Sequence, residues 1–289
     1  MKQKRPAAPS PSDSQSKNAS TKRTVSEEPV VFGFQDFWSV VYGAYTLGLD
    51  AIVADSHLAT DLFNSAQTKM LGRFETLELA VYLLVSMTTG GLQEVLILAG
   101  NGAGVGAIKI ARGMFESAVM AEYLRRNPSE VDDYTEYGRV LMWKRMQQYP
   151  DEFTPEQRKG VENEYQRVKP RFAKRNGDVR NQWNKNSIRF MADAVGRKKQ
   201  YDLPYSFAAS MHHGNFEAMT VHIKPSQDTL SVEELPSLKW VMQSLVSGHL
   251  YLLQALETLN NCMQLDFDSR IAESLTRFKK VWRLRSSTA

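Results

Sequence analysis

Cysteine is almost absent from this sequence, which has one, Cys262, among 289 residues. A single thiol excludes an internal disulfide framework and a zinc site built from several cysteines. The chain also lacks the Glu-x-x-His and His-Glu-x-x-His spacings of metal-binding helices. It has no Gly-Lys-Ser/Thr, so a phosphate-binding P-loop is excluded as well. We therefore predict no metal and no cofactor.

Long apolar runs are also missing. The longest, from Leu77 to Met87, is about half as long as the roughly 20 residues that a membrane-spanning helix needs, and Glu94 interrupts its continuation. The N-terminal segment has no apolar run of the kind that a secretory signal contains. These absences predict a cytoplasmic protein of bacterial type without a membrane span.

Apolar residues are scarce at the N-terminus. Residues 1–28 contain one valine and no aromatic side chain, so they cannot bury enough apolar surface to offset the entropy of ordering. We predict a disordered tail over residues 1–28 and an all-helical domain over residues 29–289. The roughly 260 residues of that domain are enough for a sizeable hydrophobic core.

The sign of the charge alternates along the chain, although the net charge is +4. Residues 30–138 carry six basic and thirteen acidic side chains, whereas residues 139–199 carry sixteen basic and seven acidic ones. Residues 270–289 are basic again, with six basic side chains and one acidic. This patchwork is not a uniformly basic surface, and it weakens a general case for nucleic-acid binding.

Helix signals recur throughout the domain, and sustained alternation of apolar and polar residues is scarce. The predicted fold class is therefore all-α, a single multi-helix bundle with a disordered N-terminal tail. We expect helices at residues 34–49, 55–70, 73–87 (ended by Gly90-Gly91), 103–126, 179–195, 204–213 and 269–283.

Two further helices begin at capping signals. Ser129-Glu-Val-Asp132 and Thr154-Pro-Glu-Gln157 predict starts of helices that run to about residues 147 and 174. Near the C-terminus, a set of apolar residues alternates three- and four-residue steps, which predicts a buried helix seam with a core histidine. Its members are Met242, Leu245, His249, Leu252, Leu256, Leu259 and Met263.

A glycine-rich segment precedes the helix expected at residues 103–126. Gly100-Asn-Gly-Ala-Gly104-Val-Gly106 imitates the loop that binds a dinucleotide after a strand. Such a site needs a second strand about 20 residues later, ending in an acid that binds the ribose. Here the pattern continues as helix through Leu124. We therefore favour a close-packed start of a helix over a nucleotide site.

Two charged residues occupy this helix. At 100° per residue, Arg112, Glu116 and Tyr123 fall within one narrow arc, and apolar residues occur on both sides of the helix. The i,i+4 spacing lets Arg112 and Glu116 pair. Burying ions costs roughly several kcal/mol each unless they are well partnered. The pair is therefore either a structural contact that fixes packing or one wall of a preorganised pocket.

A second polar set lies near residue 210. Ser206, Ser210, His213 and Glu217 share one face if the helix continues past the Gly-Asn pair after His213. A histidine near a carboxylate can serve as general base, metal ligand or polar anchor, or it can be a satisfied structural histidine. No nucleophile elbow or orienting acid supports a Ser210–His213 hydrolase.

Basic and aromatic residues are interleaved between residues 167 and 189. Such residues can neutralise phosphates and stack on exposed bases, or they can form a solvated face that counters the acidic first half of the domain. The candidate nucleic-acid-binding residues are Arg171, Lys174, Arg175, Arg180 and Lys185.

Three segments together resemble a known family. The run GAIKIARGMFESAVMAEYLRRNP at residues 106–128, Trp183, and the run YSFAASMHHGN at residues 205–215 are similar to the bacterial domain-of-unknown-function family number five-six-seven-seven. The similarity covers about residues 34–262. It implies an all-helical protein from a bacterium and brings no activity with it. The family's Arg-x-x-x-Glu helix and distal Ser-x-x-His segment correspond to Arg112, Glu116, Ser210 and His213.

A broader comparison is the HEPN class of helical ribonucleases, which often act in toxin and phage-defence systems. Their signature is an arginine followed four to six residues later by a histidine. The nearest arginine before His212 is Arg197, fifteen residues away. An equivalent pair would have to come from two helices, for example Arg112 with His213.

Two functions stay open at this point. The first is a ligand- or partner-recognising module with a polar pocket of Arg112, Glu116 and His213, to which Tyr123 and Ser210 would contribute. The second is a HEPN-like ribonuclease or other nucleic-acid-acting enzyme. Its catalytic candidates are His213 as acid/base, Arg112 as phosphate clamp, and Glu116. The first is favoured because no catalytic spacing is satisfied. The partner is not identified, and a homodimer stays open.

Overall fold

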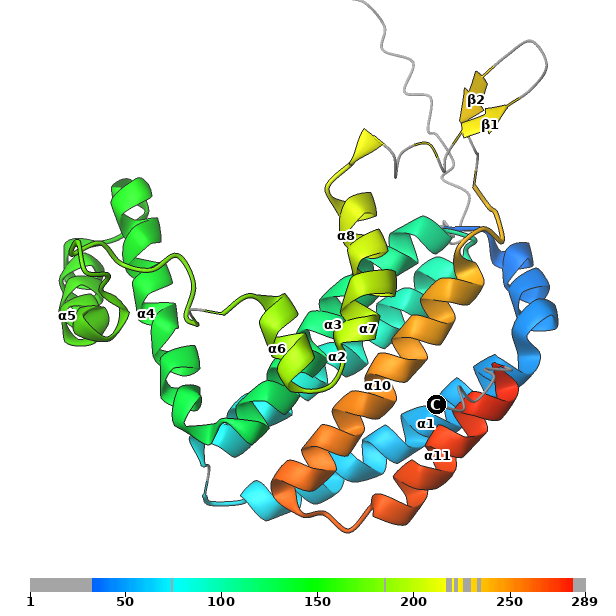
Figure 1. The fold of residues 1–289 in the computed structure, drawn as a ribbon, viewed down its shortest axis with the longest axis horizontal. Coiled ribbons are helices and arrows are strands. Elements are labelled where there is room, and N and C mark those ends of the chain that lie inside the picture. The colour runs from blue at the N-terminus through cyan, green and yellow to red at the C-terminus, as the bar shows by residue number, and fades with distance from the viewer. Residues whose placement is uncertain are drawn as a thin grey trace, which may run out of the picture. The chain divides into compact units, whose positions relative to one another are not determined.

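Helices make up almost all regular structure in this computed structural model. The structure describes residues 33–73, 75–184, 186–216, 220, 223–225, 230–232 and 235–282, so the predicted tail at residues 1–28 lies outside the described residues. The α-helices are α1 (Gln35–Met70), α2 (Thr76–Gly100), α3 (Gly104–Arg126), α4 (Val131–Gln148), α5 (Pro155–Phe172), α6 (Ile188–Ala194), α7 (Lys198–Gln200), α8 (Ser206–His212), α10 (Val241–Met263) and α11 (Asp268–Val281). Short 3-10 turns lie at η1 (Pro128–Glu130) and η2 (Pro150–Glu152), and η3 (Tyr201–Tyr205) is a π-helical turn. One small antiparallel pair joins β1 (Ile223–Pro225) to β2 (Leu230–Val232). The all-α fold class is confirmed (Figure 1).

Three long helices form the centre of the core. α10 packs against α2 and α3, which also pack against each other, and α1 and α11 pack against α10 (Figure 1). Six residues of the predicted α10 seam are fully buried, and they are Leu245, His249, Leu252, Leu256, Leu259 and Met263. Met242, in the first turn of α10, is instead 45% exposed. The seam prediction is confirmed except at Met242.

The predicted breaks in the first helices are wrong. α1 continues through residues 50–54, where the sequence predicted a break, but it is kinked at Tyr45, where two helical segments meet. The segment DAIVAD at residues 50–55 contains no glycine or proline, so nothing in it stops a helix. α2 continues through Gly90 and Gly91. A helical glycine costs only about 1 kcal/mol relative to alanine, which packing against α3 and α10 outweighs.

The glycine-rich segment connects α2 directly to α3. A Cβ at Gly104 would lie 2.2 Å from the carbonyl oxygen of Lys239, and Gly102 has a φ of +68°. At Gly102 only glycine fits, because a Cβ there would also lie 2.6 Å from the backbone nitrogen of Ser237. Since residues 94–100 belong to α2, no strand precedes the loop. The predicted close-packed start of α3 is confirmed.

The two predicted capping signals behave differently. At α5, the Gln157 backbone N–H donates to Thr154 Oγ1 at 3.3 Å, and the Thr154 backbone N–H donates to Gln157 Oε1 at 2.8 Å. This capping box is confirmed. Ser129 lies instead within η1, and α4 begins at Val131 without a side-chain cap. The proline at residue 128 starts this tighter turn, so the Ser129 prediction is wrong.

The helix predicted over residues 179–195 is wrong in its first half, since only α6 is helical there. Asparagine side chains offer the backbone other partners in this segment. Asn184 Oδ1 accepts a hydrogen bond from the backbone N–H of Asn186 at 2.7 Å. Ser187 then caps α6.

α1 and α2 are both long and apolar. By length and composition alone, Asp36–Met70 and Thr76–Gly100 could each cross a membrane, with mean hydropathy of 1.3 and 1.5. A core helix of a soluble protein passes the same test, and both helices pack against α10 here. The absence of a membrane span therefore stays a prediction.

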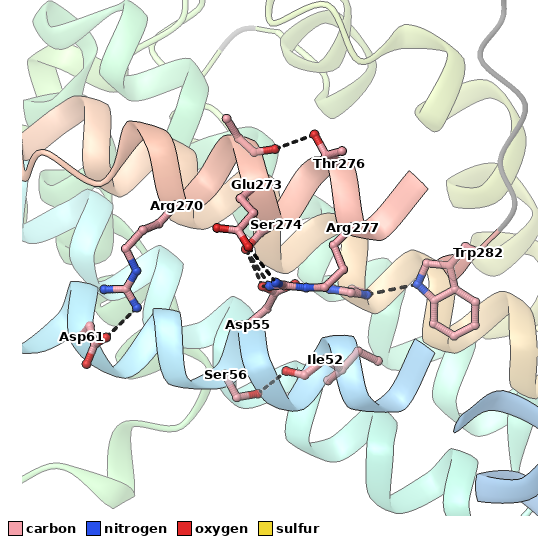
Figure 2. Close-up of polar contacts among 12 residues, drawn as sticks. Ile52, Asp55, Ser56, Asp61, Arg270, Glu273, Ser274, Thr276, Arg277 and Trp282 are labelled. Atoms are coloured by element: carbon pink, nitrogen blue, oxygen red, sulfur yellow. Dashed lines mark hydrogen bonds and ion pairs between the residues drawn. The ribbon is translucent and has the colours of Figure 1, made fainter. Parts of the chain in front are cut away.

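A buried polar network joins α1, α10 and α11 around Asp55 (Figure 2). The Asp55 carboxylate accepts hydrogen bonds from Ser274 Oγ at 2.5 Å, from His249 Nε2 at 2.7 Å and from the Arg277 guanidinium. Trp282 Nε1 donates to His249 Nδ1 at 3.1 Å. Because an indole N–H can only donate, Nδ1 is the acceptor in this contact. Nε2 is then the nitrogen whose N–H donates to Asp55.

The surroundings of Asp55 favour its charged form. Burial by itself raises the pKa of Asp55, but the hydrogen bonds from His249 and Ser274 and the charge of Arg277 outweigh burial. The net pKa lies below the ordinary value of a carboxyl group. The predicted core histidine is thus one member of a network in which the Asp55 carboxylate has three donors, while the buried Arg277 Nε has no hydrogen-bond partner among the described residues.

Replacing Asp55 with Asn should lower the free energy of unfolding by about 3 kcal/mol, because one partner of a buried ion pair is lost. Since the folded-state pKa of Asp55 is depressed, its contribution is complete above the unfolded-state pKa of about 3.9. It is lost as the pH falls from there through the folded-state pKa. Urea unfolding of both proteins across the acid range would measure this difference.

The matched control is Asp61→Asn, because Asp61 pairs with Arg270 at the surface, where both side chains are about half exposed. This variant should change the unfolding free energy by less than about 1 kcal/mol. A difference between wild type and Asp55→Asn that stays constant as the pH falls would contradict a charged Asp55.

Candidate functional site

α3 and η3 bring three polar side chains together. Arg112 Nη2 lies 2.8 Å from Glu116 Oε1, so the predicted i,i+4 ion pair is formed. The Tyr205 hydroxyl donates to Glu116 Oε1 at 2.7 Å and accepts from Arg112 Nη2 at 3.4 Å. The Arg112 and Glu116 side chains are 20% and 33% exposed. The cluster is therefore half-buried and its members bind one another, while the buried Arg112 Nε has no hydrogen-bond partner among the described residues.

Tyr205 is held from several sides. Its ring lies 5.1 Å from the Phe115 ring and is stacked on Tyr201 at 4.7 Å, measured between ring centroids. Burial, followed by the hydrogen bond to Glu116, raises the pKa of Tyr205 to about 12. The phenol thus stays protonated and keeps donating to the carboxylate. π-helical turns such as η3 are frequent at functional sites.

Ser210 and His213 lie on α8 and at its end. Ser210 Oγ donates to a carbonyl of the preceding helical turn at 3.1 Å. His213 is exposed, and its ring lies edge-on to the His212 ring at 5.2 Å. Among the contacts of the described residues, none joins His213 to Arg112 or Glu116. The pocket of these three residues therefore stays a prediction.

Tyr123 belongs to a different part of α3. It follows Arg112 by eleven residues, which is about 16 Å along a helix axis. Its hydroxyl donates to Glu130 Oε1 at 2.8 Å, and Asn184 Nδ2 donates to the other oxygen of the same carboxylate. Tyr123 thus helps to hold the loop before α6 against η1.

Two of the five candidate basic residues, Arg171 and Arg180, pair with α4. Arg171 Nη2 lies 2.9 Å and Arg180 Nη2 3.6 Å from oxygens of Asp133. Arg180 also lies over the Phe172 ring. These contacts agree with a face that counters the acidic first half of the domain. The other predicted residues are Lys174 and Arg175, which are exposed, and Lys185, which, like Glu217, lies outside the described residues.

A polar cleft of about 310 Å³ lies between α3, α10 and the turn from α6 to α7. Arg197, in that turn, is only 8% exposed. Its Nη1 donates to the carbonyl oxygen of Ala118 on α3 at 3.1 Å. Within the described part of the chain, no carboxylate lies within 4 Å of its guanidinium. Burial is the main reason why the pKa of Arg197 is lowered to about 10.

Glu122 is the acid with the largest charge effect on the pKa of Arg197, and its carboxylate already accepts hydrogen bonds from other side chains. Glu122 receives two hydrogen bonds from Arg125, at 2.7 and 2.9 Å, and one from Arg126 at 2.5 Å. Thr258 donates to it at 3.3 Å. Burial raises the pKa of Glu122, but the two arginines outweigh burial and lower it overall. The Glu122 carboxylate is therefore saturated without Arg197.

The residues of this cleft were not among the candidates that the sequence patterns indicated. The spacing Glu122-x-x-Arg125-Arg126 was the available signal, because positions i+3 and i+4 both face the carboxylate. Nothing local marks Arg197, which is buried only because its turn packs on α3, 79 residues away at Ala118.

The fold and the cleft define an all-α bundle with an arginine-lined cavity. In the described part of the chain, no three His, Cys, Asp or Glu side chains are grouped to hold a metal ion. Residues 78–230, more than half of the chain, match the Family of unknown function (DUF5677), and the chain belongs to this family. The resemblance drawn from its motifs is confirmed. No curated protein and no solved structure matches the chain.

Replacing Tyr205 with Phe should remove the hydroxyl between Arg112 and Glu116 while keeping the ring. We expect the free energy of unfolding to fall by about 1–2 kcal/mol, because a hydrogen bond to a partly exposed charged group is lost. Because the folded-state pKa is raised, this contribution is complete below the unfolded-state pKa of about 10 and is lost as the pH rises through about 12.

Alkaline titration of tyrosinate absorbance would check this assignment, since the variant should lose one phenol that ionises near pH 12. Tyr149→Phe is the control, because Tyr149 is 52% exposed. Its unfolding free energy should stay within about 0.5 kcal/mol of wild type. A Tyr205→Phe protein as stable as the control would argue against the hydroxyl bridge.

Proposed function

We propose that this protein is a recognition module that binds a small molecule bearing an anionic group in the Arg197 cleft. One observation carries the proposal: Arg197, a residue that is only 8% exposed, lines a cavity of about 310 Å³, and no carboxylate of the described chain lies within 4 Å of its guanidinium.

The physical argument rests on the cost of burying a charge. An ion removed from water is destabilising unless a counter-charge and hydrogen bonds compensate it. Glu122 is saturated by Arg125, Arg126 and Thr258. A carboxylate or phosphate can accept two parallel hydrogen bonds from one guanidinium, which suits a preorganised arginine. A desolvated, perturbed charge in a cleft is a recognised mark of a functional site.

The Arg112–Glu116–Tyr205 cluster is a weaker candidate for the same role. Its ion pair is already formed and bridged by a hydroxyl, so an anionic ligand would have to displace Glu116. The two regions are connected, since Gln200 lines the cleft and Tyr205 ends the turn that follows. We propose that the cluster positions this turn, and that the cleft binds the ligand.

The ribonuclease alternative has no observation in its favour. Arg112 is paired with Glu116, and Arg171 and Arg180 are paired with Asp133. Because these arginines are paired, they do not provide a phosphate clamp or a basic face that could bind a nucleic-acid strand. We therefore propose recognition without catalysis.

The test compares Arg197→Met with Arg189→Met at constant ionic strength, because salt screens weak binding of anions. Arg189 is the control, since its side chain is 60% exposed and pairs with Asp202. Calorimetric titration with phosphate, acetate and succinate should show saturable binding to wild type and Arg189→Met. Arg197→Met should lose at least about tenfold in affinity, which is the loss expected for a charge-assisted contact.

Stability separates this role from a structural one. Without ligand, Arg197→Met should unfold at the same free energy as wild type or be up to about 4 kcal/mol more stable, because a buried charge becomes apolar. Marked destabilisation of Arg197→Met, or undiminished binding by it, would contradict the proposal.

A further inference from the structure

The two walls of the Arg197 cleft differ in character. The wall formed by α3 and the α6–α7 turn carries three positively charged donors, Arg125, Arg126 and Arg197. It also carries the Glu122 carboxylate, which Arg125 and Arg126 neutralise, so that Arg197 is the arginine left for a ligand. The wall formed by α10 carries Gln254, Glu257 and Asn261. Steps of three and four residues place these side chains on one face of α10.

Several acceptors of the cleft have no donor from the protein. Gln200 Oε1 and Gln254 Oε1 are buried, and no described group donates a hydrogen bond to either oxygen. Glu257 is exposed, and no described basic side chain lies within 4 Å of its carboxylate. Buried acceptors without partners are rare, and each one in a native structure calls for an explanation.

A ligand of one charge fits only half of this arrangement. The second carboxylate of a dianion would face Glu257, and a simple amine would face Arg197. A molecule with both an anionic group and an ammonium group complements both walls, because an ammonium carries three donors and no acceptor. Glu257 also acts on Arg197, whose pKa it raises after the larger effects of burial and of Glu122. The two charges thus lie within electrostatic reach of each other.

We infer, resting on the proposed function, that the ligand is a small zwitterion such as an amino acid or an aminoalkyl phosphonate. Its anionic group pairs with Arg197, and its ammonium group pairs with Glu257 and Gln254. A cavity of about 310 Å³ is at the lower end of the size of small-molecule sites. This size favours a molecule of few atoms over a nucleotide or a peptide.

The experiment uses pairs of probes that differ only in the amine: alanine with propionate, γ-aminobutyrate with butyrate, and 3-aminopropylphosphonate with propylphosphonate. Their affinities for the full-length protein are measured by calorimetry at constant ionic strength. We expect the amine-bearing member of at least one pair to bind about tenfold more tightly, as expected for one charge-assisted hydrogen bond. Glu257→Gln should erase this preference without lowering the affinity for the simple anion, because it removes a nearby negative charge.

Glu152→Gln is the matched control, since Glu152 is exposed and lies in η2, away from the residues that line the cleft. It should keep the full preference. One outcome would overturn the inference of a zwitterionic ligand and leave the proposed function standing. In that outcome both members of every pair bind wild type equally well, and Arg197→Met loses this binding. An equal loss for both members in Glu257→Gln would also overturn it. If no probe binds wild type, or if propylamine binds as tightly as the zwitterions, both proposals fail.

Discussion

The arrangement of α1, α10 and α11 depends on the carboxylate of Asp55. Donors from two other helices meet at this group, in a core from which water is excluded. A carboxylate without partners there would cost several kcal/mol, roughly, so only an arrangement that brings these donors together is stable. Apolar contacts tolerate small shifts between helices, whereas a hydrogen bond of 2.5–2.7 Å does not. We interpret the network as the contact that selects one packing among many.

Local patterns explain how much of this fold could be predicted. The α10 seam is visible because burial repeats every three to four residues, and Thr154 is visible because a capping box is complete within four residues. The wrong helix predictions occur where other contacts, not the local apolar pattern, decide the structure. α2 continues through Gly90 and Gly91 because its neighbours stabilise it, and the segment before α6 is irregular because asparagine side chains bind its backbone. Tertiary packing decides such cases, and propensity alone does not.

The candidate sites divide in the same way, into contacts that a local pattern encodes and contacts that tertiary packing creates. Arg112 and Glu116 could be found because an i,i+4 pair is encoded within five residues. Their bridge to Tyr205 could not, since it spans 89 residues. The burial of Arg197 is even harder to predict from the sequence. Exposed arginine is the ordinary expectation, and its burial arises only when the turn between α6 and α7 packs against α3. Sequence patterns therefore identify pairs, whereas a cleft requires the assembled fold.

Two of the buried charges, Asp55 and Arg197, differ in how far the chain itself compensates them. Asp55 meets donors from His249, Ser274 and Arg277, so its charge is compensated within the chain and leaves nothing for a ligand. Arg197 has a backbone carbonyl as its partner and faces a cavity. Both charges are desolvated, but only the second has interactions that a ligand can complete. A preorganised group of this kind keeps its geometry without the ligand, so little ordering entropy opposes binding. This difference, more than the presence of charge itself, is why we propose the cleft between α3 and α10 as the recognition site.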